Sequence, residues 1–131
     1  MPDEDTIQAL LAALEFRSVS EVFATSGDSG AATWRVRHAG GTVAVRVFPP
    51  GHAAAVERER RCMATARAAG LPVPAIERII AWQGRPVMVL EWLAGCTVAD
   101  ELATHPWRAW HQGVLFGRMQ AAIHQVMAPP D

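Results

Sequence analysis

The chain has 131 residues, of which 50% are hydrophobic and 19% are charged, and this balance is typical of a globular domain with its own core. Its formal net charge of −1 argues against a nucleic-acid-binding protein, because such proteins usually carry a strongly basic surface. No apolar run reaches the roughly 18 residues that a membrane-spanning helix needs, so no membrane partner is expected.

The two cysteines, Cys62 and Cys96, stand alone, without a CxxC or Cys/His spacing, so the sequence predicts no metal site. The N-terminus lacks the basic start and apolar centre of a signal peptide. These features predict a cytoplasmic protein with reduced thiols, although two cysteines are enough for one disulfide.

The first part of the chain predicts one helix followed by three strands. An amphipathic helix is indicated by four apolar residues at the spacing i, i+3, i+4 and i+7: Ile7, Leu10, Leu11 and Leu14. Runs rich in β-branched and aromatic residues, separated by glycine-containing turns, predict strands at residues 20–25, 33–38 and 42–48. Alternation with period two places Trp34 on one face of the second strand and Arg35 on the other.

A strand and a helix around residue 50 carry the two most informative charges. Pro49-Pro50-Gly51 ends the third strand, and a run rich in Ala and Arg predicts a helix over residues 53–69. Arg46 shares a strand face with Ala44, and Glu59 falls on the apolar stripe of the helix. Because burying a lone carboxylate is costly, Glu59 needs a partner, and Arg46 is predicted to supply it.

These residues match a known order. Val43-Ala44-Val45-Arg46 resembles the Val-Ala-Ile-Lys strand of protein-kinase-like folds, with Arg in place of Lys. Gly70-Leu71-Pro72-Val73-Pro74, eleven residues after Glu59, is similar to the aminoglycoside phosphotransferase family. The resemblance implies that Arg46 pairs with Glu59 and holds nucleotide phosphate, and that Ala44 packs on adenine.

The loop between the first two strands has two interpretations. It holds two glycines, and in kinase-like folds this position covers the nucleotide phosphates, because glycine lets backbone N–H groups approach an anion. Two glycines are also ordinary hairpin chemistry, and the full Gly-x-Gly-x-x-Gly pattern of protein kinases is absent. By resemblance, the candidate phosphate-covering residues are Gly27, Asp28, Ser29 and Gly30.

Two further strands are predicted at residues 76–82 and 87–92. The second is almost continuously apolar, as expected of a strand that is covered on both faces. The run from Met88 to Gly95 resembles the hinge of the phosphotransferase family, where adenine bonds the backbone just after the fifth strand. This implies nucleotide contacts at Glu91, Trp92 and Leu93, whereas the alternative is a strand that simply ends in a glycine turn.

The remaining residues predict two helices. Thr97 is expected to cap a short helix over residues 98–103, and a long helix is predicted over residues 106–127. The long helix is apolar on two faces, which predicts exposed apolar surface and self-association through this helix. Its second half resembles the helix that precedes the catalytic loop in the phosphotransferase family.

Several groups that phosphoryl transfer needs are missing from this sequence. The reaction uses an Asp that positions the acceptor hydroxyl, and metal ligands that are typically an Asn and a second Asp. The chain has no His-x-Asp triplet and no Asn at all. No catalytic residue is therefore predicted in this chain, and the chain alone is expected to be inactive.

The predicted fold class is α+β: a kinase-like small lobe, made of a five-stranded antiparallel sheet plus one packed helix, followed by the first helices of a truncated large lobe. The expected domains are residues 1–93, the N-terminal lobe with its N-terminal helix, and residues 94–131, the hinge exit and the first helices of an incomplete C-terminal lobe. The chain is thus interpreted as the N-terminal portion of its family's fold.

The function implied by the resemblance is that of an ATP-dependent phosphotransferase similar to aminoglycoside and other small-molecule kinases. Its implied cofactors are ATP and magnesium, and its implied partners are the nucleotide and, in the full-length protein, a small hydroxylated acceptor. Two alternatives stay open. One is a non-catalytic, pseudokinase-like nucleotide-binding module, and the other is a plain interaction domain in which Arg46 and Glu59 form a structural ion pair.

Overall fold

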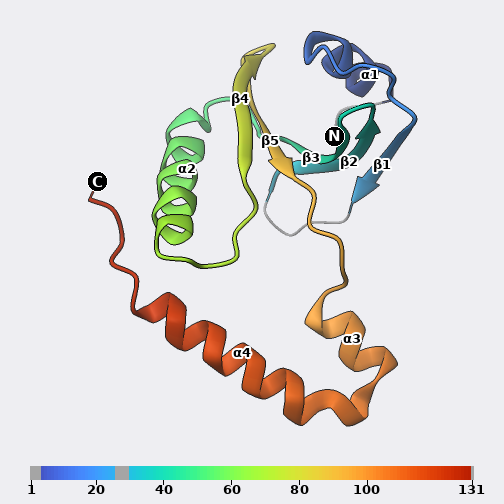
Figure 1. The fold of residues 1–131 in the computed structure, drawn as a ribbon. Coiled ribbons are helices and arrows are strands. Elements are labelled where there is room, and N and C mark those ends of the chain that lie inside the picture. The colour runs from blue at the N-terminus through green and yellow to red at the C-terminus, as the bar shows by residue number, and fades with distance from the viewer. Residues whose placement is uncertain (1–3, 26–29, 131) are drawn as a thin grey trace. The chain divides into compact units, whose positions relative to one another are not determined.

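Five strands pair in one antiparallel sheet, in the order β1-β2-β3-β5-β4 (Figure 1). The computed structural model describes residues 4–25 and 30–130 of the chain. The strands are β1 (Glu21–Thr25), β2 (Ala32–His38), β3 (Gly41–Val47), β4 (Ile76–Trp82) and β5 (Arg85–Glu91). The chain runs from β3 through a helix to the edge strand β4 and then returns, so β5 pairs with β3 in the middle of the sheet.

One face of the sheet forms the core with helix α1 (Glu4–Ala13). The helix places its apolar stripe against side chains of β2, β3 and β5, which alternate so that every second residue points to this face. Burying each such side chain contributes about 1.5–3 kcal/mol, so this cluster holds the helix on the sheet. Its buried members are Ile7, Leu10, Leu11, Leu14, Trp34, Val36, Val43, Val45, Val47, Val87 and Val89.

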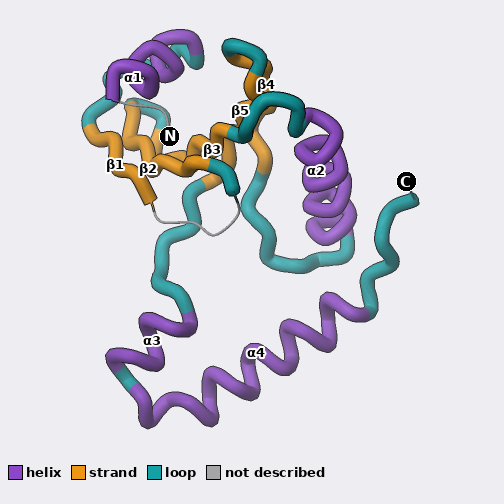
Figure 2. The backbone as a smooth tube through the Cα atoms, turned by 180° about the vertical axis from the view of Figure 1, so that it is seen from behind, coloured by secondary structure: helices purple, strands orange, loops and turns teal. Residues whose placement is uncertain are grey.

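The opposite face of the sheet receives the start of helix α2 (Ala53–Ala68), whose backbone can be followed in Figure 2. The register pairs Ala44 with Leu90 and Arg46 with Met88, so these four side chains share the face turned away from α1. Met88 and Leu90 are buried. Strand β5 is therefore covered on both sides, which confirms the prediction from its continuous apolar run.

The turn between β4 and β5 is shorter than the sequence suggested. Pro86 led to a predicted strand start at residue 87, but β5 begins at Arg85, which pairs with Trp82. Gln83 and Gly84 alone make the turn, and both have positive φ, at 49° and 73°. A two-residue hairpin of this kind matches the natural twist of the strands, so Pro86 becomes a strand residue. Its carbonyl accepts a hydrogen bond of 2.9 Å from the N–H of Phe48.

Contacts divide the chain into two compact units: Met1–Arg60 with Pro74–Trp92, and Arg61–Val73 with Leu93–Asp131. The second unit holds α3 (Val98–Thr104), a 3₁₀ turn (Pro106–Arg108) and α4 (Ala109–His124). The predicted cap of α3 is confirmed, because the Thr97 hydroxyl accepts a hydrogen bond of 3.0 Å from the N–H of Asp100.

The predicted long helix over residues 106–127 was wrong at both ends. It starts as a 3₁₀ turn and its α-helical part stops at His124. After His124 the backbone continues with tighter i→i−3 hydrogen bonds, from the N–H of Gln125 to the carbonyl of Ala122 and from the N–H of Val126 to the carbonyl of Ile123. The division into domains at residue 93 stays a prediction.

Within the described ranges, none of the helices combines the length and the apolar character needed to cross a lipid bilayer. The cytoplasmic location stays a prediction. Across the described residues, α+β is the fold class that the sequence predicted, with the five-stranded antiparallel sheet, the helix after β3 and the helices that follow β5 all present.

Candidate functional site

An ion pair joins the middle strand of the sheet to helix α2. Arg46 lies on β3, on the face turned away from α1, and its Nη1 donates a hydrogen bond to Oε1 of Glu59. The Arg46 side chain is 15% exposed and the Glu59 side chain 35% exposed. The guanidinium carbon of Arg46 also lies 4.9 Å from the centre of the Phe48 ring. This confirms the predicted pairing of the strand arginine with the helix glutamate.

The helix that carries Glu59 has a narrow attachment to the sheet. Val56 is the buried residue of α2, and it lies three positions before Glu59, so both side chains share one face of the helix. A neighbouring pair, Glu57 with Arg60, stays on the exposed side of the same helix, with 2.6 Å between Oε1 and Nη2. Position on the helix therefore decides that Glu59, and not Glu57, meets the strand.

The register places a continuous row of side chains across the same face of the sheet. Each member is the direct partner of the next, so the row crosses all five strands. In spatial order the row is Phe23, Arg35, Ala44, Leu90 and Ile76. The next row on this face, two residues along β3, contains Arg46 and the buried Met88. Ala44 is thus a small residue between larger neighbours, one row from a held guanidinium.

The predicted hinge residues lie at the end of β5 and directly after it: Glu91 is the last residue of the strand, and Trp92 and Leu93 follow. The backbone N–H of Glu91 donates to the carbonyl of Ala75 at 2.8 Å, and its carboxylate accepts from the N–H of Ala75 at 3.0 Å. An adenine contact at Glu91 would therefore use its carbonyl oxygen and not its N–H. Trp92 is half-buried and lies two residues after Leu90, while Leu93 is 54% exposed and opens the second unit.

The predicted phosphate-covering loop lies only partly within the residues that the structure describes. Gly27, Asp28 and Ser29 lie outside the described residues. Gly30 is exposed and has φ of +68°, a left-handed conformation that favours glycine and fits a turn entering β2. The role of this loop at a phosphate stays a prediction.

Sequence reasoning assigned no role to Arg35 and Phe23. The guanidinium carbon of Arg35 lies 4.9 Å from the centre of the Phe23 ring and 5.7 Å from the centre of the Trp92 ring. Alternation had placed Arg35 on the correct face of β2, but its neighbours depend on strand order and register. The local pattern offered no signal for either.

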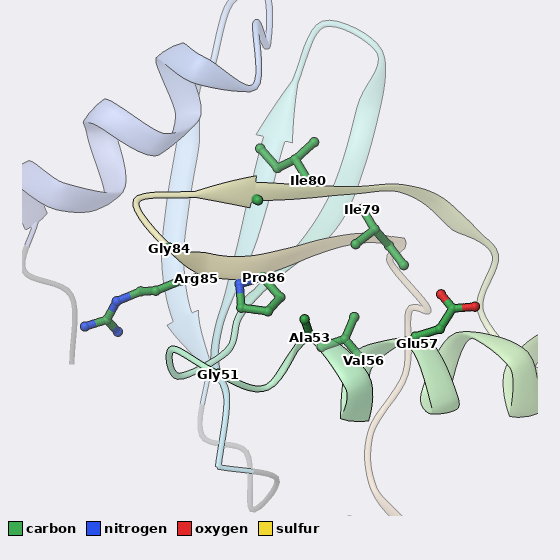
Figure 3. A pocket seen from close by; sticks show the side chains of 10 residues that line it. Gly51, Ala53, Val56, Glu57, Ile79, Ile80, Gly84, Arg85 and Pro86 are labelled. Carbon is green, nitrogen blue, oxygen red and sulfur yellow. The ribbon is translucent and has the colours of Figure 1, made fainter. Parts of the chain in front are cut away.

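A hollow on the same unit lies apart from these residues (Figure 3). It has a volume of about 330 Å³ and lies between the first turns of α2 and the hairpin of β4 and β5. The side chains of Ala53, Val56, Ile79 and Pro86 gather around it, and Arg85 points away. Its lining is mostly apolar and includes neither Arg46 nor Glu91, so it is not the predicted nucleotide site.

The residues that the structure describes do not form a magnesium site. The sequence contains no Asn, and residues 4–25 and 30–130 hold no group of three or more His, Cys, Asp or Glu side chains with the spacing of metal ligands. Cys62 and Cys96 are both free and exposed.

Comparison with known families now gives these features a context. Residues 21–131 match the family described as the phosphotransferase enzyme family. The chain belongs to this family. The match includes β3, α2 and the Arg46–Glu59 pair, and it confirms the resemblance that the strand and hinge motifs suggested. No curated protein sequence matches the chain. The family match supports a phosphotransferase-like role for the chain.

Proposed function

We propose that this chain binds ATP on the sheet face of Ala44 and Arg46, as the nucleotide-binding part of an ATP-dependent phosphotransferase. The Arg46–Glu59 ion pair is the observation that carries the proposal. A guanidinium that is fixed by a carboxylate and packed on an aromatic ring is already oriented, so it loses little conformational entropy when it binds an anion. Arg46 would hold the phosphate groups through charge-assisted hydrogen bonds.

The base would lie one row away from Arg46. Ala44 is half-buried and leaves room for a flat ring, and the cross-strand neighbours on β5, Leu90 and Met88, are apolar. The carbonyl of Glu91 would accept a hydrogen bond from the exocyclic amine of adenine, and the backbone of Trp92 and Leu93 would extend this edge. The residues Gly27, Asp28, Ser29 and Gly30 would cover the phosphates from the loop between β1 and β2.

Within this chain, the proposed chemistry stops at binding and orienting the nucleotide. Phosphoryl transfer draws most of its rate from positioning the acceptor and from stabilising charge on the transferred group. Arg46 supplies part of that charge, but no His-x-Asp triplet and no Asn are present to position an acceptor hydroxyl or to hold magnesium. The acceptor, a small hydroxylated molecule, would be bound by residues that this sequence does not contain.

The same absence favours a second candidate function. A non-catalytic nucleotide-binding module needs only the Ala44 and Arg46 face, and it requires neither an acceptor site nor metal ligands. Both candidates predict ATP binding, whereas a plain interaction domain does not. ATP titration therefore separates both candidates from a plain interaction domain. Neither candidate expects catalysis by this chain, so turnover of labelled ATP with a panel of amino-alcohols that follows the protein through purification would contradict both.

Calorimetric titration of the purified chain with ATP tests the binding proposal. We expect Arg46→Gln to weaken ATP binding at least tenfold, because one charge-assisted contact with phosphate contributes about 1.5–3 kcal/mol. Arg60→Gln is the matched control, since Arg60 also pairs with a glutamate of α2 but on its exposed side. Equal affinities of the two variants for ATP would overturn the proposed role of Arg46.

A further inference from the structure

A cationic and aromatic cluster lies on the same face of the sheet as Ala44 and Arg46, beside Ala44. Arg35 is the direct cross-strand partner of both Phe23 and Ala44. Its guanidinium carbon lies 4.9 Å from the Phe23 ring centre and 5.7 Å from the Trp92 ring centre. Both distances fall within the range of cation–π contacts. Three strands of the sheet or their ends, β1, β2 and β5, thus contribute one group each.

The cluster is accessible and only weakly tied by charge. Phe23 is 51% exposed and lies on the edge strand β1. Oε2 of Glu21 lies 4.0 Å from Nη2 of Arg35, at the limit of an ion pair. The aromatic contacts therefore do more than the ion pair to fix the guanidinium plane.

The order of side chains along β3 shows where the cluster lies relative to Arg46. Arg46 and Ala44 are two residues apart, about 7 Å along a strand, and Arg35 and Leu90 flank Ala44 on either side. Trp92 follows Leu90 by two residues, away from the row of Arg46. A nucleotide with its phosphates at Arg46 and its base at Ala44 would therefore point its base toward Arg35 and Trp92.

We propose that Arg35, supported by Phe23 and Trp92, is a base-binding platform on which the purine ring of the nucleotide stacks. This inference rests on the proposed function, because it takes Arg46 as the phosphate end of the same site. A guanidinium is planar, delocalised and more weakly hydrated than an ammonium group, so it stacks on flat heterocycles as well as on aromatic side chains. Arg35 is then a specificity-determining residue that favours nucleosides over bare phosphate chains.

The experiment compares two ligands, ATP and inorganic triphosphate, on the full chain. Arg35→Gln removes the plane and the charge, and Arg35→Lys keeps the charge but removes the plane. Arg37→Gln is the matched control, because Arg37 lies two residues along the same strand on the same face and pairs with the same Glu21, with 3.4 Å between Nη1 and Oε1. Affinities are measured by calorimetry, and circular dichroism checks that each variant is folded.

We expect Arg35→Gln and Arg35→Lys to weaken ATP binding by about tenfold, the usual effect of losing one stacking partner of a base. Binding of inorganic triphosphate by Arg35→Lys should match that of the unsubstituted chain, and Arg37→Gln should bind both ligands as before. Trp92→Phe keeps an aromatic ring and is expected to fold, and it should lose most of the tryptophan fluorescence quenching that ATP binding causes. This variant tests whether the base lies at the cluster even if an Arg35 variant fails to fold.

Other results would overturn the inference. If Arg35→Lys binds ATP as tightly as the unsubstituted chain, Arg35 acts only through its charge and provides no stacking surface. If the Arg35 variants lose affinity equally for ATP and for inorganic triphosphate, the residue does not distinguish the base. If the unsubstituted chain binds inorganic triphosphate but not ATP, the platform is wrong and Arg46 still holds phosphate. If it binds neither ligand, the proposed function itself fails and this inference with it.

Discussion

Helices α2 and α4 have the same length, 16 residues each, but the more polar helix, α2, has a buried residue and the more apolar helix, α4, has none. Helix α2 is rich in charged residues and alanine, yet it buries Val56 and pairs Glu59 with Arg46. Helix α4 contains several large apolar side chains, yet none of its residues is buried. Those exposed side chains include Trp110, Val114, Leu115, Phe116, Met119 and Ile123. The contacts of a few positions, and not the total hydrophobicity of a helix, therefore determine whether it packs against a sheet.

The largest expected effect tests the buried anchor of α2. Val56→Ala should lower the free energy of unfolding by about 2 kcal/mol, because it removes two buried methyl groups and leaves a cavity beside the sheet. Ile123→Ala on α4, 48% exposed in the parent chain, should change it by less than about 0.5 kcal/mol. Urea denaturation of both variants measures the contrast. Equal losses would mean that α4 has found cover and that the two helices do not differ.

The second effect concerns the ion pair. Glu59→Ala should lower the free energy of unfolding by about 1–2 kcal/mol, since it removes the Glu59 carboxylate from the mostly buried guanidinium of Arg46. The effect is no larger because Glu59 is about one-third exposed, and solvent screens part of the interaction. Glu57→Ala is the control on the same helix, and its pair with Arg60 is exposed, so its effect should be near zero. Thermal unfolding at low and high salt reports both. A Glu59→Ala variant as stable as the control would contradict the burial of the pair.

The third effect concerns association and not folding. The exposed apolar side chains of α4 should make the chain self-associate or bind a hydrophobic dye, because contiguous apolar surface of more than a few hundred Å² usually marks an interface. Trp110→Ser, at a residue that is 84% exposed, should reduce association in sedimentation experiments with little loss of stability. A monomeric parent chain with no dye binding would remove the contrast between α2 and α4 in solution.

The smallest effect lies in the helix that precedes α4. The guanidinium of Arg108, 2.7 Å from Glu101, holds the pKa of the Glu101 carboxyl below its ordinary value. A carboxyl with a lowered folded-state pKa stabilises the fold above its unfolded-state pKa, and this contribution is lost as the pH falls through the folded-state pKa. Nuclear magnetic resonance titration should therefore show Glu101 protonating at lower pH than an ordinary glutamate. Arg108→Gln should move its pKa back up; an unchanged titration would show that Arg108 is not the cause.

Local patterns predicted most of the architecture. The spacing of Ile7, Leu10, Leu11 and Leu14 was enough for α1, because a helix that buries one stripe must repeat it every turn. Alternation on β3 and the helical stripe of α2 predicted the Arg46–Glu59 pair, since each rule fixes which way a side chain points within its own element. The strand boundary at Pro86 failed because a proline suggested a turn that two residues with positive φ make without it.

Residue patterns were enough to predict which side chains share a face of each helix and strand, because that geometry follows from backbone periodicity over a few residues. The sequence therefore contained the α+β class, the strand arginine and the helix glutamate. Which faces of these helices and strands contact one another could be read only from the folded structure, since strand order and register arise from pairing between distant segments. That pairing placed Arg35 between Phe23 and Trp92 and beside Ala44, a neighbourhood that no local pattern of these residues specifies.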